Sequence, residues 1–119
     1  MRTVTKTLTL PVGEGPKTFR LTKLDAFSGA RVLQLLHASS ADDLSAFLLS
    51  LPEETLAALM RTCLRHAEIS LPAGFIRVWD RDCWGLPELE YETLACYRLT
   101  QEVLAWTLED FFPAGGQPS

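Results

Sequence analysis

The fold is decided by residues 3–22, which read TVTKTLTLPVGEGPKTFRLT. Threonine occupies every odd position from 3 to 9, and mostly apolar side chains occupy the even positions, which is the period of a half-buried β-strand. The prolines and glycines of residues 11–16 supply turn chemistry, and Phe19 and Leu21 then resume the alternation. These features predict two strands joined as a hairpin.

Three helices are predicted after the hairpin. Asp25 can accept hydrogen bonds from free backbone N–H groups, so we expect it to begin a helix that ends near Ala38. Ser40, with Asp43 three residues later, resembles a capping box at the start of a second helix, and Pro52 suits the first turn of a third. Apolar residues at helical spacing mark the buried faces of the second and third helices: Leu44, Phe47, Leu48, Leu51, Leu56, Leu59, Met60, Cys63 and Leu64.

Residues 68–87 interrupt the helical pattern. They are too apolar for a solvated linker, but the prolines and glycines among them forbid a continuous helix. We expect a packed crossover there, with a short strand at 75–79, followed by a last long helix over roughly residues 88–111. That helix has two adjacent apolar stripes, namely Cys96, Leu99, Val103 and Trp106, and Tyr97, Leu104, Leu108 and Phe111.

The order of these elements predicts a single α+β domain over residues 1–112. We expect its N-terminal β-hairpin to pack on a mostly helical bundle of about four helices, and a chain of 119 residues is long enough to bury one core. Residues 113–119, which are rich in glycine and proline, are expected to form a mobile tail.

The composition is that of an acidic globular protein. Apolar residues make up 47% of the chain and charged residues 22%, which argues against disorder. The formal net charge is −4 and lysine and arginine never form a run, so nucleic acid is not an expected partner. No stretch approaches the roughly 18 apolar residues of a membrane span, and the N-terminus has no hydrophobic signal region. We therefore expect a cytoplasmic protein that does not contact membranes.

The three cysteines, an odd number without paired spacing, are expected to be reduced thiols. Cys63 and His66 share a helix face, as a thiol nucleophile and its base would, but neighbours on a helix meet in this way by default. Cys63, His66, Cys83 and Cys96 could supply four zinc ligands, yet their spacing matches no structural zinc site. We therefore predict no catalytic, cofactor or metal site, and a protein that is not an enzyme.

Aromatic side chains concentrate in the C-terminal third of the chain. Most are expected in the core, but a domain of this size can hardly bury them all, and an exposed remainder forms the kind of apolar patch that marks a protein interface. Phe111 and Phe112, at the end of the last helix, are the ones that we expect to be exposed. The predicted partner-binding surface is the end of that helix, with Leu104, Trp106, Leu108, Phe111 and Phe112.

Two stretches resemble the tail assembly chaperones of long-tailed phages. Residues 17–27, which read KTFRLTKLDAF, and the following helix with Arg31, Val32 and Leu33 resemble the opening of these proteins. Residues 99–112, which read LTQEVLAWTLEDFF, are similar to the helix with which many of them close. The resemblance covers the order of elements through most of the chain.

The resemblance implies a protein-binding function without catalysis. Such chaperones bind the long, aggregation-prone tape-measure protein, keep it soluble and help to recruit the tail-tube protein, and the family has no catalytic residues to transfer. A spare apolar stripe serves self-association equally well, so a homo-oligomer stays open. Two alternatives remain: a small phage or bacterial regulatory or inhibitory protein-binding domain, and an enzyme that uses Cys63 or Cys83.

Overall fold

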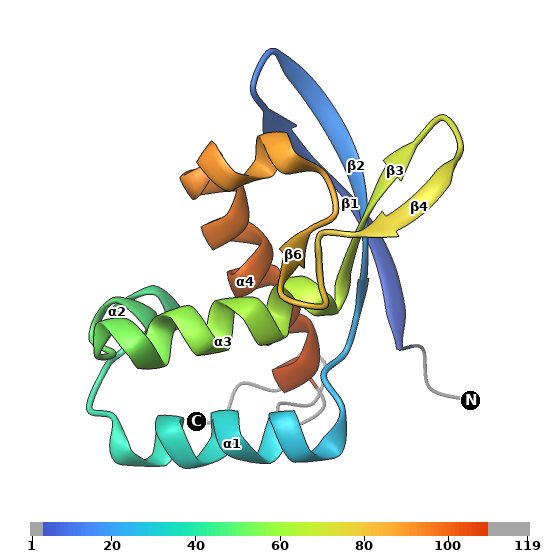
Figure 1. The fold of residues 1–119 in the computed structure, drawn as a ribbon. Helices are drawn as coiled ribbons and strands as arrows, with labels where there is room; N and C mark the ends of the chain where they lie inside the picture. The colour runs from blue at the N-terminus through green and yellow to red at the C-terminus, as the bar shows by residue number, and fades with distance from the viewer. Residues whose placement is uncertain (1–3, 110–119) are drawn as a thin grey trace.

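The computed structural model describes residues 4–109, which form a four-stranded antiparallel sheet with helices against one face (Figure 1). The strands of this sheet, in spatial order, are β1 (Thr5–Val12), β2 (Gly15–Thr22), β3 (Ala67–Leu71) and β4 (Gly74–Arg77). The helices are α1 (Ala26–Ala38), α2 (Leu44–Leu49), α3 (Glu53–Arg65), the 3₁₀ helix η1 (Pro87–Tyr91) and α4 (Thr93–Leu108). A small separate hairpin consists of β5 (Trp79–Asp80) and β6 (Cys83–Trp84). The predicted α+β class is confirmed.

The N-terminal hairpin forms as its alternation predicts. β1 and β2 pair along their whole length, from Thr5 opposite Thr22 to Val12 opposite Gly15. Gly13 has a positive φ of 59° in the turn, a conformation that glycine adopts without steric cost. The alternation therefore decides both the pairing and which face of the hairpin meets the helices.

The crossover contains more strand than we predicted from its sequence. We expected one strand at 75–79, whereas β3 and β4 both join the main sheet and the β5–β6 hairpin follows. As predicted, no continuous helix forms over residues 68–86, and Pro72 lies in the turn between β3 and β4. β3 pairs with β2 over a long sequence separation, with Ile69 opposite Phe19, and no local pattern reveals such pairing.

The helix starts follow the predicted capping chemistry, with one correction. Asp25 caps α1, since its carboxylate accepts a hydrogen bond from the backbone N–H of Ser28 at 3.1 Å. Asp43, and not Ser40, caps α2, because its carboxylate accepts from the N–H of Ala46 at 2.7 Å and the residues between Ser40 and Asp43 are not helical.

The last helix is shorter than predicted and lies at the centre of the core. Pro87 begins the separate helix η1, and Glu92, with φ −100° and ψ 68°, interrupts the helical backbone before α4. α4 then packs against α3, α2 and the first two strands. Its buried residues come from both predicted stripes and from positions between them: Ala95, Cys96, Leu99, Thr100, Val103, Leu104, Thr107 and Leu108.

None of the helices within residues 4–109 combines the length and the apolar character that a membrane crossing requires.

Candidate protein-binding surface

The structure buries part of the predicted partner-binding surface on α4. Leu104 is fully buried and Leu108 is only 7% exposed, because α2, α3 and the sheet pack around the helix. The side chain of Leu104 is therefore not accessible to a partner, whereas that of Leu108 lines the groove described below. Phe111 and Phe112 lie outside the described residues, as does the predicted tail 113–119.

Trp106 of α4 is partly buried and contacts Val4, the residue before β1. Its indole Nε1 donates a hydrogen bond to the carbonyl of Val4 at 3.0 Å. The ammonium groups of Lys23 and Lys6 lie 4.5 Å and 5.2 Å from the ring centroid, within cation–π range. The ring is therefore covered by the chain's own residues, and its contacts are structural.

α1 is apolar in sequence but poorly buried in the structure. Arg31 is its one side chain with a full charge at neutral pH, yet only Gly29 and Val32 are buried. Phe27 is 89% exposed and Leu33 is 40% exposed. Because a helix with so few charged residues normally buries most of its surface, α1 offers apolar area that nothing within residues 4–109 covers.

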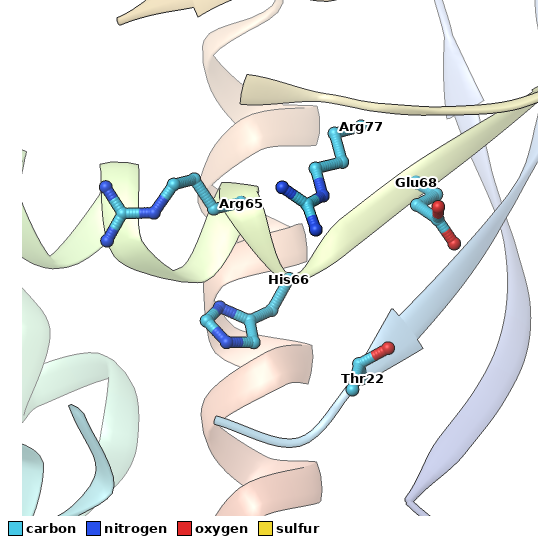
Figure 2. Close-up of a pocket in the computed structure, with 5 residues that line it drawn as sticks. All are labelled: Thr22, Arg65, His66, Glu68 and Arg77. Atoms are coloured by element: carbon cyan, nitrogen blue, oxygen red, sulfur yellow. The ribbon is translucent and has the colours of Figure 1, made fainter. Parts of the chain in front are cut away.

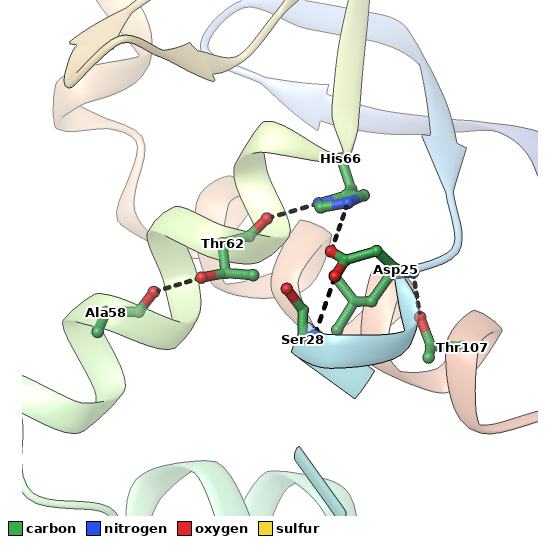
Figure 3. Close-up of polar contacts among 7 residues, drawn as sticks. Asp25, Ser28, Ala58, Thr62, His66 and Thr107 are labelled. Atoms are coloured by element: carbon green, nitrogen blue, oxygen red, sulfur yellow. Dashed lines mark hydrogen bonds and ion pairs between the residues drawn. The ribbon is translucent and has the colours of Figure 1, made fainter. Parts of the chain in front are cut away.

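Polar contacts hold the N-terminal end of α1 (Figure 3), while Leu35 and Leu36 near its other end pack against the core. The N–H of Leu24 donates to the buried hydroxyl of Thr107 at 2.9 Å, which ties the approach to α1 to the last turn of α4. Asp25 caps the helix, and its second carboxylate oxygen lies 3.7 Å from Nε2 of His66. The hydrogen bonds from Ser28 hold the pKa of Asp25 below its ordinary value.

An apolar groove lies where the C-terminal ends of α1 and α4 meet the start of α2, and we call it the α1–α2–α4 groove. It has a volume of about 450 Å³. Leu36 of α1, Leu44 and Phe47 of α2 and Leu108 of α4 line its floor, and the exposed Ala105 lies on its wall. Volume and lining are those of a site that accepts apolar groups.

The exposed rim of this groove is acidic. Asp42, Asp43 and Glu109 line it, and no lysine, arginine or histidine does. Asp43 already accepts the capping hydrogen bond from Ala46. The side-chain carboxylates of Asp42 and Glu109 make no hydrogen bond or ion pair with any residue in the part of the chain that the structure describes. Two carboxylates at the edge of an apolar groove are thus not neutralised by any described residue.

A second hollow, of about 230 Å³, is polar (Figure 2). It is lined by Thr22, Arg65, His66, Glu68 and Arg77. Glu68 pairs with Arg20 at 2.7 Å and Arg77 with Asp80 at 3.3 Å, while the guanidinium of Arg65 points away from the other lining side chains (Figure 2). Since most of these charges are already paired within the chain, the hollow has no strong preference for a charged ligand.

The thiols do not form a reactive site in the structure. Burial raises the pKa of the Cys63 thiol far above its ordinary value and raises that of Cys96 to about 11. Nδ1 of His66 donates to the carbonyl of Thr62 at 2.9 Å and so is not directed at the thiol of Cys63. Cys83 is exposed. Within residues 4–109, no group of three or more His, Cys, Asp and Glu side chains is placed to hold a metal ion.

Comparison of the chain with protein-family models, with curated proteins and with solved structures gave no match. The function must therefore be inferred from the residues and their arrangement.

The groove could not be predicted from the sequence alone. Its walls come from three helices, and the two rim carboxylates, Asp42 and Glu109, are brought together only by the fold. One signal was present: α1 has a single fully charged side chain, Arg31, which is few for a helix at the surface. That excess of apolar residues could have marked α1 as part of an interface.

Proposed function

We propose that the protein is a non-enzymatic assembly chaperone of long-tailed phages, which binds the tape-measure protein at α1 and the α1–α2–α4 groove. The observation that supports this best is the contrast within α1, whose side chains are mostly apolar but mostly exposed. Such a surface is costly in water and is stabilised when a partner covers it. The sequence resemblance supplies the identity of the partner.

The groove suits a long helical client. A helix presents apolar side chains at i, i+3, i+4 and i+7, and such a row can enter an apolar groove between helices. Free in solution, a long protein made of such helices exposes these rows and aggregates. Binding of each row by a small acidic domain would cover the apolar area and add negative charge, and both effects favour solubility.

A second exposed apolar surface lies at the other end of α4. Tyr91 is 82% exposed and Leu94 is 76% exposed. They lie at the start of α4, whereas the groove lies at its end, so a second partner can bind there without blocking the first. This surface is our candidate for contact with the tail-tube protein or with another copy of the chain.

The test is co-expression with the long helical protein encoded downstream, with soluble yield and co-purification as readouts. We expect the long protein to be soluble only in the presence of this chain and to elute with it. Ala105→Arg, which places a long charged side chain in the groove, should abolish this effect. Ala73→Arg, the same replacement in the exposed turn between β3 and β4, should preserve it.

Equal insolubility of the long protein with and without the wild-type chain would contradict the chaperone proposal. The regulatory or inhibitory alternative would then be favoured, and its target would be sought among host proteins.

A further inference from the structure

We infer that the occupant of the α1–α2–α4 groove is a basic amphipathic helix, whose apolar side chains enter the groove and whose lysine or arginine side chains contact Asp42 and Glu109. The inference rests on the proposed function and names the chemistry of the client segment.

The apolar floor favours a helix over an extended peptide. Leu36, Leu44, Phe47 and Leu108 offer no polar side-chain atoms to an occupant. An extended segment needs partners for its own backbone N–H and C=O groups, whereas a helix satisfies them internally. The edge strands that could pair with an extended peptide are β1 and β4 of the main sheet and the two strands of the β5–β6 hairpin, and none of them contributes to the groove.

The charge at the rim favours a basic occupant. Asp42 and Glu109 are exposed and unpaired among the described residues, and covering them with an apolar or acidic partner would cost desolvation and repulsion. The backbone adds to the negative potential, because α1 and α4 both end at the groove and a helix C-terminus carries partial negative charge. The N-terminal end of α2 is the one opposing dipole, and the carboxylate of Asp43 already caps it.

The experiment uses the full chain and two model peptides of about 20 residues, long enough to form a helix on binding. Both carry leucine at i, i+3, i+4 and i+7, and the remaining positions are lysine in one and glutamate in the other. Binding is followed by titration and by amide chemical shifts in NMR spectra. We expect the lysine peptide to bind and to shift the amides of Leu44, Phe47, Ala105 and Leu108, and the glutamate peptide not to bind.

A charge reversal tests whether the rim is responsible. The double variant Asp42→Lys with Glu109→Lys should weaken binding of the lysine peptide at least about tenfold and allow the glutamate peptide to bind. Glu88→Lys with Glu90→Lys changes the net charge by the same amount on the exposed surface of η1 and is the matched control. That control should bind the lysine peptide nearly as well as wild type does.

Four results would overturn the inference. Equal weakening by both double variants would mean that the peptide binds through net charge alone. Amide shifts in the groove of the peptide-free chain on Phe111→Ser with Phe112→Ser would show that the chain's own C-terminal segment occupies it. Shifts that depend on protein concentration would show that a second copy does. If the Asp42→Lys, Glu109→Lys variant still solubilised the long client as wild type does, the inference about the rim would fail while the chaperone proposal stood.

Discussion

α1 and α3 are helices of the same length, 13 residues, yet they differ in how much of their surface the fold covers. α3 carries four fully charged side chains and still buries Leu59, Cys63 and Leu64, largely against α4. α1 carries one charged side chain, and only Gly29 and Val32 are buried. The more apolar helix is thus the less buried one, which shows that α3 contributes more to the core while α1 has apolar surface that no residue within 4–109 covers.

The largest expected effect is in the core beneath α3. Leu64 is 3% exposed, so Leu64→Ala should lower the free energy of unfolding by about 2–5 kcal/mol through lost burial and the cavity left behind. Leu33→Ala, the same change on α1, should cost less than about 1 kcal/mol, because Leu33 is already 40% exposed. Urea denaturation of both variants measures the difference. Similar losses for the two would mean that α1 is part of the core.

The next largest loss of stability is expected on substitution of Gly85, which follows the small β5–β6 hairpin. A Cβ on Gly85 would overlap the backbone carbonyl oxygen of Arg77, and backbone cannot move aside as a side-chain tip can. Gly85→Ala should therefore lower the free energy of unfolding by about 1–3 kcal/mol or more. Gly15→Ala is the control, since its Cβ would meet nothing within 4 Å, and it should change stability by about 0.5 kcal/mol or less. Thermal unfolding measures both.

Removal of the α1 cap should have a smaller and pH-dependent effect. Asp25→Ala should lower the free energy of unfolding by about 1 kcal/mol at neutral pH. The folded pKa of Asp25 lies below its ordinary value of 3.8, so the stabilisation is present above that value and is lost as the pH falls through the folded pKa. The difference between wild type and variant should therefore shrink in acid. A difference that grew on acidification would contradict this assignment.

Alkylation of the cysteines should distinguish buried from exposed positions, and it needs no variant that changes the stability of the protein. In the native protein at mildly alkaline pH we expect an alkylating reagent to modify Cys83, which is exposed, and to spare Cys63 and Cys96, which are buried with raised pKa values. All three should react after denaturation. Mass spectrometry of the alkylated protein distinguishes the sites, and rapid native modification of Cys63 would show that α3 opens readily.

The elements with a local signal were predictable from sequence. The alternation of apolar and polar residues predicts the two strands of the β1–β2 hairpin, and the capping carboxylate of Asp25 predicts where α1 begins. β3 could not be found in this way, because Ile69 is held by pairing with Phe19 far away in the chain. Pro72 prevents a continuous helix there, as predicted, but it does not reveal that the strands on either side of its turn pair with each other.

The candidate site was harder to predict for the same reason. Periodicity correctly identified Leu104 and Leu108 as apolar positions on a helix, but it cannot say how many neighbours surround that helix. α4 is packed from several sides, so both residues are core. Asp42 and Glu109 are far apart in the sequence, and only the folded arrangement of α1 and α4 places both at the rim of the groove.

The most direct test of the account is amide hydrogen exchange on the protein alone and in complex with the long client protein. In the free protein, the amides of α1 should exchange faster than those of α3, because few buried contacts resist local opening of α1. In the complex, we expect new protection in α1, in α2 and at the end of α4. Protection confined to the edges of the sheet or to the region of Tyr91 and Leu94, with α1 unchanged, would contradict the claim that α1 and the groove bind the client.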